Sequence, residues 1–109
     1  MMIKKLTEAE EVVMKAVWDC KKEPVLSEVA VRLREYYERD WKPQTVSTFM
    51  AKLVQKQYVQ MKRNGKIYTY KVLVKEEDYN KAQLKHLYTF LYRNNKEQMR
   101  QDLEKLQNA

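Results

Sequence analysis

The chain contains a single glycine, Gly65, which follows Asn64 between two segments rich in β-branched and aromatic residues. An Asn-Gly pair in that setting is the strongest short-range signal for a β-hairpin, so residues 58–63 and 67–72 are predicted strands. With one glycine and two prolines among 109 residues, the chain lacks the turn residues that an all-β fold needs. We therefore predict a mainly α-helical fold with one small β-hairpin.

Positive charge is concentrated in the third of the chain that contains this hairpin. Residues 41–75 hold eight Lys or Arg and no Asp or Glu, whereas residues 1–40 have a net charge of −1 and residues 76–109 a net charge of zero. All of the excess charge of +7 therefore comes from one segment. A distribution this uneven predicts a surface that binds a polyanion.

A first helix is predicted to begin at Thr7, because Thr7-Glu8-Ala9-Glu10 matches the capping-box pattern. Met14 and Trp18 lie together on one side of this helix, and we expect them to dock against a second element, such as the C-terminal helix or a partner subunit. The other side carries small or apolar residues at helical spacing, which we expect to face the core: Ala9, Val13, Ala16, Val17 and Cys20.

A second helix is predicted after Pro24, which stops the first helix. Val25 and Leu26 are compatible with a very short strand, and Ser27 is a good N-cap for a helix that extends to about Glu38. The apolar positions of this helix are Val29, Ala30, Leu33, Tyr36 and Tyr37.

A third helix is predicted to begin at Pro43, where a missing N–H costs nothing, and to extend to about Gln57. Its apolar side consists of Val46, Phe49, Met50, Leu53 and Val54. Its other side presents mostly short polar side chains: Gln44, Thr45, Ser47, Thr48, Ala51, Lys52 and Gln55. An amphipathic helix with such a polar side can enter a groove.

Residues 76–109 return to a helical pattern, and the chain is expected to divide into residues 1–75 and this C-terminal segment. Asn94-Asn95 is expected to break the segment into two helices. An apolar seam runs along both helices, and no further chain is left to cover it. The seam either folds back on the first part or, as we predict, forms a homodimer interface. Its residues are Tyr79, Leu84, Leu87, Tyr88, Leu91, Met99, Leu103 and Leu106.

The sequence lacks the residues of the common catalytic and metal sites. Cys20 is the only cysteine and His86 the only histidine, and no Gly-rich phosphate loop or G-x-S-x-G turn is present. We therefore predict no enzyme activity, no cofactor, no metal and no small-molecule substrate. No apolar run approaches the roughly 20 residues that cross a bilayer, and no signal-peptide pattern is present. We expect a cytoplasmic protein without membrane insertion.

Three helices followed by a basic hairpin is the order of a winged helix-turn-helix domain. In this fold the third helix enters the major groove of DNA, and the hairpin, called the wing, reaches the sugar-phosphate backbone. Lys and Arg can neutralise phosphates, Gln can pair with adenine edges, and Thr methyl groups can contact thymine. The predicted DNA-binding residues are Lys42, Gln44, Thr45, Ser47, Thr48, Lys52, Lys62, Arg63 and Lys66, with Lys56 as a further candidate phosphate contact. The alternative is a protein-interaction module that uses this fold without reading DNA sequence.

Several motifs also resemble a known family. They comprise residues 6–10 with Val13-Met14 and Val17-Trp18, then residues 40–48, and then residues 51–56. Residues 66–70 are similar to the aromatic strand of that family, and residues 77–79 to the acidic start of its dimerisation segment. The chain thus resembles the penicillinase-repressor family, which includes the methicillin-resistance repressors and a copper-responsive branch. This resemblance covers residue 6 to about residue 92.

The resemblance implies a dimeric winged-helix transcriptional repressor that binds an inverted-repeat operator in double-stranded DNA. Thr45 and Thr48 match the two threonines of the family's recognition helix, and Ser47 occupies a variable position that contributes to readout. Gln44 stands where the family usually has lysine, and Lys52 stands for an arginine. Three departures concern packing and helix ends: Glu11 replaces a tryptophan, Lys42 a capping serine and Gln57 a glycine.

The resemblance leaves the releasing signal open. Antibiotic-responsive members control an antibiotic-response operon and are cleaved through the protease pathway of a membrane-bound β-lactam sensor. The cleaved segment has no match beyond Tyr92, and the Cys-x-Cys pair of the copper-responsive branch is absent. A membrane sensor-protease pathway therefore stays a candidate partner.

Overall fold

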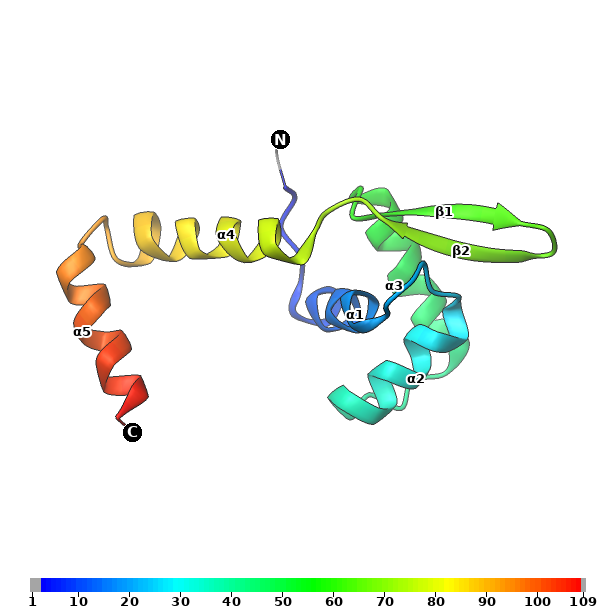
Figure 1. The fold of residues 1–109 in the computed structure, drawn as a ribbon, viewed down its shortest axis with the longest axis horizontal. Helices are drawn as coiled ribbons and strands as arrows, with labels where there is room; N and C mark the ends of the chain where they lie inside the picture. Colours follow the sequence, from blue (N-terminus) through cyan, green and yellow to red (C-terminus); the bar gives the residue numbers. More distant parts are fainter. Residues whose placement is uncertain (1–2, 109) are drawn as a thin grey trace. The chain divides into compact units, whose positions relative to one another are not determined.

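The computed structural model describes residues 3–108, and the chain divides into two compact units between Glu76 and Glu77. Within the described residues, the first unit contains three helices and an antiparallel hairpin, and the second contains the C-terminal helices (Figure 1). The fold class, mainly α with one small hairpin, is confirmed. The elements are α1 (Glu8–Asp19), α2 (Leu26–Tyr37), α3 (Pro43–Gln55), β1 (Val59–Asn64), β2 (Ile67–Val72), α4 (Glu76–His86), the π-helical turn η1 (Leu87–Leu91) and α5 (Lys96–Gln107).

The start of α1 is the predicted capping box. Thr7 Oγ1 accepts a hydrogen bond from the Glu10 N–H at 3.2 Å, and Glu10 Oε1 accepts one from the Thr7 N–H at 2.8 Å. These bonds satisfy N–H groups that have no partner inside the helix. From this start α1 packs against α2 and α3. The core of the first unit consists of Leu6, Val13, Met14, Ala16, Val17, Val29, Leu33, Val46, Met50, Leu53, Tyr58, Val59, Tyr70 and Val74.

The prediction that Met14 lies off the core side of α1 is wrong, whereas Trp18 does bond to another part of the chain. Met14 is fully buried in the core. Trp18 Nε1 donates a hydrogen bond to the Val74 carbonyl at 3.0 Å, just after β2. Because α1 has neighbours on several sides, its buried surface is wider than the single stripe that helical spacing indicates.

α2 begins earlier than predicted. Leu26 is its first residue and Val25 its N-cap, and Glu28 Oε1 accepts the Val25 N–H at 3.1 Å. Ser27 therefore lies inside the first turn, and the short strand expected at Val25 and Leu26 does not form. The Pro24 carbonyl instead accepts a hydrogen bond from the Tyr70 N–H at 3.0 Å, so one bond ties this segment to β2.

α3 begins at Pro43, as predicted, but ends at Gln55. Gln57 follows with a φ of 64°, in the left-handed region that favours glycine. The Tyr58 N–H then bonds back to the Leu53 carbonyl at 2.9 Å. A glutamine thus makes the helix end that glycine usually makes, at a cost of about 1 kcal/mol.

The predicted hairpin is confirmed, with its turn shifted by one residue. Asn64 pairs with Ile67, so Gly65 and Lys66 are the central turn residues. Gly65 has a φ of 70°, which matches the positive φ required at the first central position of a type II′ turn. The base of the hairpin joins the core through Val59 and Tyr70, whereas every side chain from residue 61 to residue 68 is exposed. Figure 1 shows the hairpin projecting beyond the helices of the first unit.

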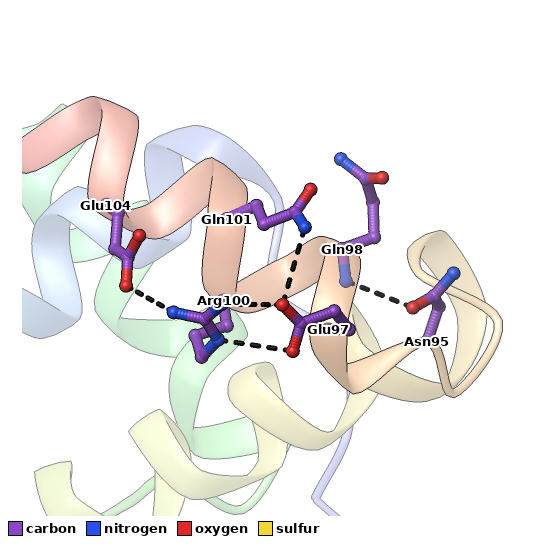
Figure 2. Close-up of polar contacts among 6 residues, drawn as sticks. All are labelled: Asn95, Glu97, Gln98, Arg100, Gln101 and Glu104. Carbon is purple, nitrogen blue, oxygen red and sulfur yellow. Dashed lines mark hydrogen bonds and ion pairs between the residues drawn. The ribbon is translucent and has the colours of Figure 1, made fainter.

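The second unit has the predicted break between its helices. η1 ends at Leu91, and Arg93 and Asn94 both have positive φ, 52° and 64°. Asn95 then caps α5 by accepting the Gln98 N–H at 3.0 Å (Figure 2). Figure 2 also shows the polar side of α5, where Arg100 bridges Glu97 and Glu104.

The π-helical turn changes the predicted apolar seam. A π-turn holds more residues than an α-turn, so the seam does not continue at regular spacings of three and four. Phe90, which the predicted seam lacked, is 68% exposed, and its ring stacks on His86 with 5.3 Å between ring centroids. Tyr79, which the seam included, is only 4% exposed in the single chain.

Candidate nucleic-acid interface

The exposed side of α3 carries the residues that were predicted to read DNA. Val46, Met50 and Leu53 are fully buried, and this orients the opposite side of the helix toward solvent. The structure therefore brings the predicted polar residues together on one open surface. These exposed residues are Lys42, Gln44, Thr45, Ser47, Thr48 and Lys52.

The N-terminus of α3 is electrostatically suited to an anion. Its first turn contains no acidic residue, and Lys42 at the N-cap makes no side-chain capping bond. The positive end of the helix dipole is therefore not compensated by a carboxylate from its own turn. A phosphate group is the kind of anion that such an end attracts.

The hydroxyl donor of Thr48 is already used in a hydrogen bond within α3. Its Oγ1 donates to the Gln44 carbonyl at 3.0 Å, one helical turn earlier. A hydroxyl group has one donor and two acceptor lone pairs, so Thr48 still offers an acceptor and a methyl group to a ligand. This combination suits the amino group of adenine or cytosine, or the methyl group of thymine.

The wing presents its three predicted cations at exposed positions. Arg63 Nε donates to the Gly65 carbonyl at 3.0 Å across the turn, and Lys66 is itself a turn residue. Lys62 differs, because its ammonium forms an ion pair at 3.5 Å with Glu23, from the loop before α2. Sequence patterns give no sign of Glu23, since it lies 39 residues away along the chain.

Lys56 is not a free cation, in contrast to its predicted phosphate contact. Its Nζ lies 2.6 Å from Glu10 Oε1 and donates to the Lys5 carbonyl at 3.0 Å. Glu10 is only 3% exposed. Burial raises the pKa of the Glu10 carboxyl, but hydrogen bonds from Lys56 and Thr7 outweigh burial and hold the pKa below its ordinary value. Lys56 therefore joins the end of α3 to the start of α1.

Tyr58 strengthens the same junction. It is fully buried, and its hydroxyl donates to the Lys4 carbonyl. Burial, together with the carboxylates of Glu10 and Glu11, raises the pKa of Tyr58 to about 12, so the phenol stays protonated. The C-terminal end of α3 is thus held against α1 and the residues before it, and this fixes the orientation of its exposed side.

The residues predicted for a dimer interface differ in exposure within the single chain. Leu84, Leu91, Leu103 and Leu106 are between 54% and 74% exposed. Leu87, Tyr88 and Met99 are half-buried. An open groove of about 570 Å³ between α4 and α5 is lined by Lys81, Leu84, Lys85, Tyr88, Lys96 and Met99. The dimer interface stays a prediction.

Residues 3–108 contain neither a metal-binding cluster nor a helix able to span a membrane. No group of three or more His, Cys, Asp or Glu side chains gathers there in an arrangement that could hold a metal ion. None of the helices in that range has the length and apolar composition to cross a membrane.

Comparison with known proteins places these features in a family. The model of the penicillinase repressor family matches residues 6–107, which extends beyond Tyr92, where the motif resemblance ended. The methicillin resistance regulatory protein MecI of Mammaliicoccus sciuri is 32% identical over 73 residues, and these cover 67% of this chain and 57% of MecI. The match thus spans little more than half the length of that relative.

Two solved structures resemble the fold. One is the monomeric form of BlaI from Bacillus licheniformis in complex with the blaP half-operator, with a TM-score of 0.57, 27% identity and coverage of 72% of this chain and 92% of that chain. The other is the DNA-binding domain of the repressor BlaI, with a TM-score of 0.57, 28% identity and the same coverage. Since the family model matches residues 6–107, this chain belongs to the penicillinase repressor family.

Proposed function

We propose that this chain is a transcriptional repressor that binds double-stranded operator DNA. The observation that carries the proposal is the surface formed by α3 and the wing, where exposed polar and basic side chains stand in a segment without Asp or Glu. The similarity to BlaI, a repressor solved in complex with a half-operator, supports it. A repressor acts where its operator lies, so we propose the cytoplasm as its location.

In this proposal α3 enters the major groove and the wing lies against the backbone. Gln44, Thr45, Ser47 and Thr48 face the base edges, and Lys42 and Lys52 stand at the borders of that face. Lys62, Arg63 and Lys66 contact phosphates from the wing. None of these roles requires a covalent step, so we propose a binding protein rather than an enzyme.

Two copies of the chain would bind one inverted repeat. Isolated apolar side chains are common on protein surfaces, but residues 77–108 expose a series of them, and the second unit has little core of its own. We propose that this series pairs two chains, because a twofold dimer matches the symmetry of an inverted repeat. Each α3 would then read one half-site.

We further propose that this chain controls an antibiotic-response operon, because antibiotic-responsive members of the family do so. Loss of the dimer would remove one half-site and much of the affinity, so any event that separates the two chains would release the operator. A membrane sensor with a protease pathway is the candidate partner for such an event. Cleavage of the purified chain by the protease of that pathway, followed by loss of operator binding, is the test.

Operator binding is tested by selecting duplexes from a randomised pool in the presence of competitor DNA. The proposal expects an inverted repeat to be enriched and a gel shift that survives competitor. Binding with no selected sequence would favour the alternative, a protein-interaction module with a basic surface. A palindromic sequence whose two halves must both be intact would support the dimer.

The roles of α3 and the wing are separated by two variants. Thr48→Ala should weaken binding to the selected operator by about 1–3 kcal/mol and leave binding to random DNA nearly unchanged. Lys66→Ala should weaken both alike and make the slope of log K against log salt shallower by about 1. Equal losses of Thr48→Ala on both DNAs would contradict base reading by α3.

A further inference from the structure

Two cations and two aromatic rings form a column that runs from the segment before α3 onto the helix itself. The Trp41 and Phe49 rings stack with 5.0 Å between centroids and 27° between planes. Arg39 Cζ lies 6.0 Å from the Trp41 ring centroid, and Lys52 Nζ lies 5.4 Å from the Phe49 ring centroid. We call these four residues the aromatic column. It links the turn before α3 to the exposed side of the helix.

The two cations of the column keep their charge available for a ligand. Within residues 3–108, no carboxylate forms an ion pair with Arg39 or Lys52, although Glu38 and Asp40 adjoin Arg39 in sequence. Arg39 Nη1 donates to the Tyr37 carbonyl at 3.0 Å, which leaves most of the guanidinium donors for another acceptor. An aromatic ring attracts a cation without neutralising it. The column therefore fixes two charges in place and leaves them able to bind an anion.

The column follows one edge of the exposed side of α3. Thr45, Phe49 and Lys52 are separated by four and three residues, so they share this edge, and Trp41 stands at the turn that leads into the helix. The phosphate backbone borders the groove that a recognition helix enters. Cations at this edge are thus placed for phosphates rather than for bases.

We propose that Arg39 contacts a DNA phosphate, and that Trp41 and Phe49 position Arg39 and Lys52 as two phosphate contacts along one edge of the groove. The inference rests on the proposed function. It adds a DNA contact that lies outside both α3 and the wing. Arg suits this role, because its planar guanidinium can donate two parallel hydrogen bonds to a phosphate.

The test of the contact is the salt dependence of binding by the full chain to its selected operator duplex. Arg39→Gln should make the slope of log K against log salt shallower by about 0.9 and weaken binding at physiological salt about fivefold, on selected and random DNA alike. Arg34→Gln is the matched control, because Arg34 is an exposed arginine of α2 outside the column. It should leave the slope unchanged.

The test of positioning compares two substitutions of Trp41. Trp41→Leu removes the ring between Arg39 and Phe49 and should also make the salt slope shallower, whereas Trp41→Phe keeps a ring and should restore the natural slope. Urea unfolding of both variants shows whether each is folded. If Trp41→Leu does not fold, Arg39→Gln still tests the phosphate contact. Trp41→Phe, which should keep the natural slope, then tests whether a ring at position 41 is sufficient to position Arg39.

The outcomes separate this inference from the proposed function. If the natural chain selects no DNA, the proposed function fails, and the inference fails with it. If the natural chain selects an operator but Arg39→Gln gives the same slope and affinity as Arg34→Gln, only the inference is overturned. A folded Trp41→Leu with the natural slope would overturn the positioning role alone.

Discussion

Lys56→Met tests whether the ion pair with Glu10 holds the end of α3 against α1. Methionine keeps the apolar stem of the side chain but removes the ammonium group, which lies 2.6 Å from Glu10 Oε1 and donates to the Lys5 carbonyl. Glu10 would stay buried, with the Thr7 N–H as its remaining donor. The variant therefore leaves a buried carboxylate without its cation.

The expected loss follows from how far the pair is buried. Removing one partner of a fully buried pair costs about 3–5 kcal/mol, whereas an exposed pair contributes about 0–1 kcal/mol. The side chain of Glu10 is 4% exposed and that of Lys56 28% exposed, so the pair lies between these limits. We expect Lys56→Met to lower the free energy of unfolding by about 2 kcal/mol.

The natural chain and the variant should respond to pH in opposite directions. In the natural chain the pKa of Glu10 lies below its ordinary value of 4.5, so its contribution is present above that pH and is lost as the pH falls through the lowered pKa. In Lys56→Met burial acts without the cation, so the pKa of Glu10 should rise above the ordinary value. Protonation of Glu10 then stabilises the folded variant as the pH falls toward that value.

Urea unfolding followed by far-UV circular dichroism, at one protein concentration and a series of pH values, measures both effects. The gap in unfolding free energy between the two proteins should shrink on mild acidification. The double variant Glu10→Gln with Lys56→Met is the control, because it buries no charge and should lose the pH dependence. A loss below about 0.5 kcal/mol, as for an ordinary surface substitution, or a gap independent of pH would refute the reasoning.

Three further predictions concern affinity, the helix end and assembly. Glu23→Gln should free Lys62 and tighten DNA binding about two- to fivefold, measured by fluorescence anisotropy, and an unchanged Kd would place Lys62 outside the interface. Gln57→Gly should raise the unfolding free energy by about 0.5 kcal/mol, because its φ of 64° suits glycine, and an unmoved urea midpoint would count against this. Leu106→Asp should weaken self-association in sedimentation equilibrium, and an unaltered mass would exclude Leu106 from the interface.

Local patterns predicted those elements whose signals lie within a few residues. The capping box at Thr7 and Glu10, Pro43 at the start of α3 and the Asn64-Gly65 hairpin are decided by neighbouring groups. The same holds for the exposed side of α3. The spacing of its buried residues Val46, Met50 and Leu53 allows only one orientation of the helix against the core. Motif resemblance then connected this surface to a family.

Contacts between distant residues could not be predicted in this way. Glu10 and Lys56 are 46 residues apart, and Lys62 and Glu23 are 39 apart, so no local spacing relates them. Local spacing therefore predicts a phosphate contact for Lys56, whereas the structure pairs its half-buried ammonium with Glu10. The early start of α2 was missed because Glu28, rather than Ser27, supplies the capping oxygen.

The side chains in the outer half of the hairpin are available for binding but contribute nothing to the core. Beyond the pair Met61 and Tyr70, no side chain of the wing is buried, and only Gly65 has a backbone conformation that restricts residue choice. Mutations at Arg63, Lys66 or Tyr68 should therefore cost little stability, no more than the contribution of the cross-strand pair of Arg63 and Tyr68. Under the proposed function, selection can use this part of the chain to adjust how long the protein stays on DNA, while the core and the exposed side of α3 remain constant.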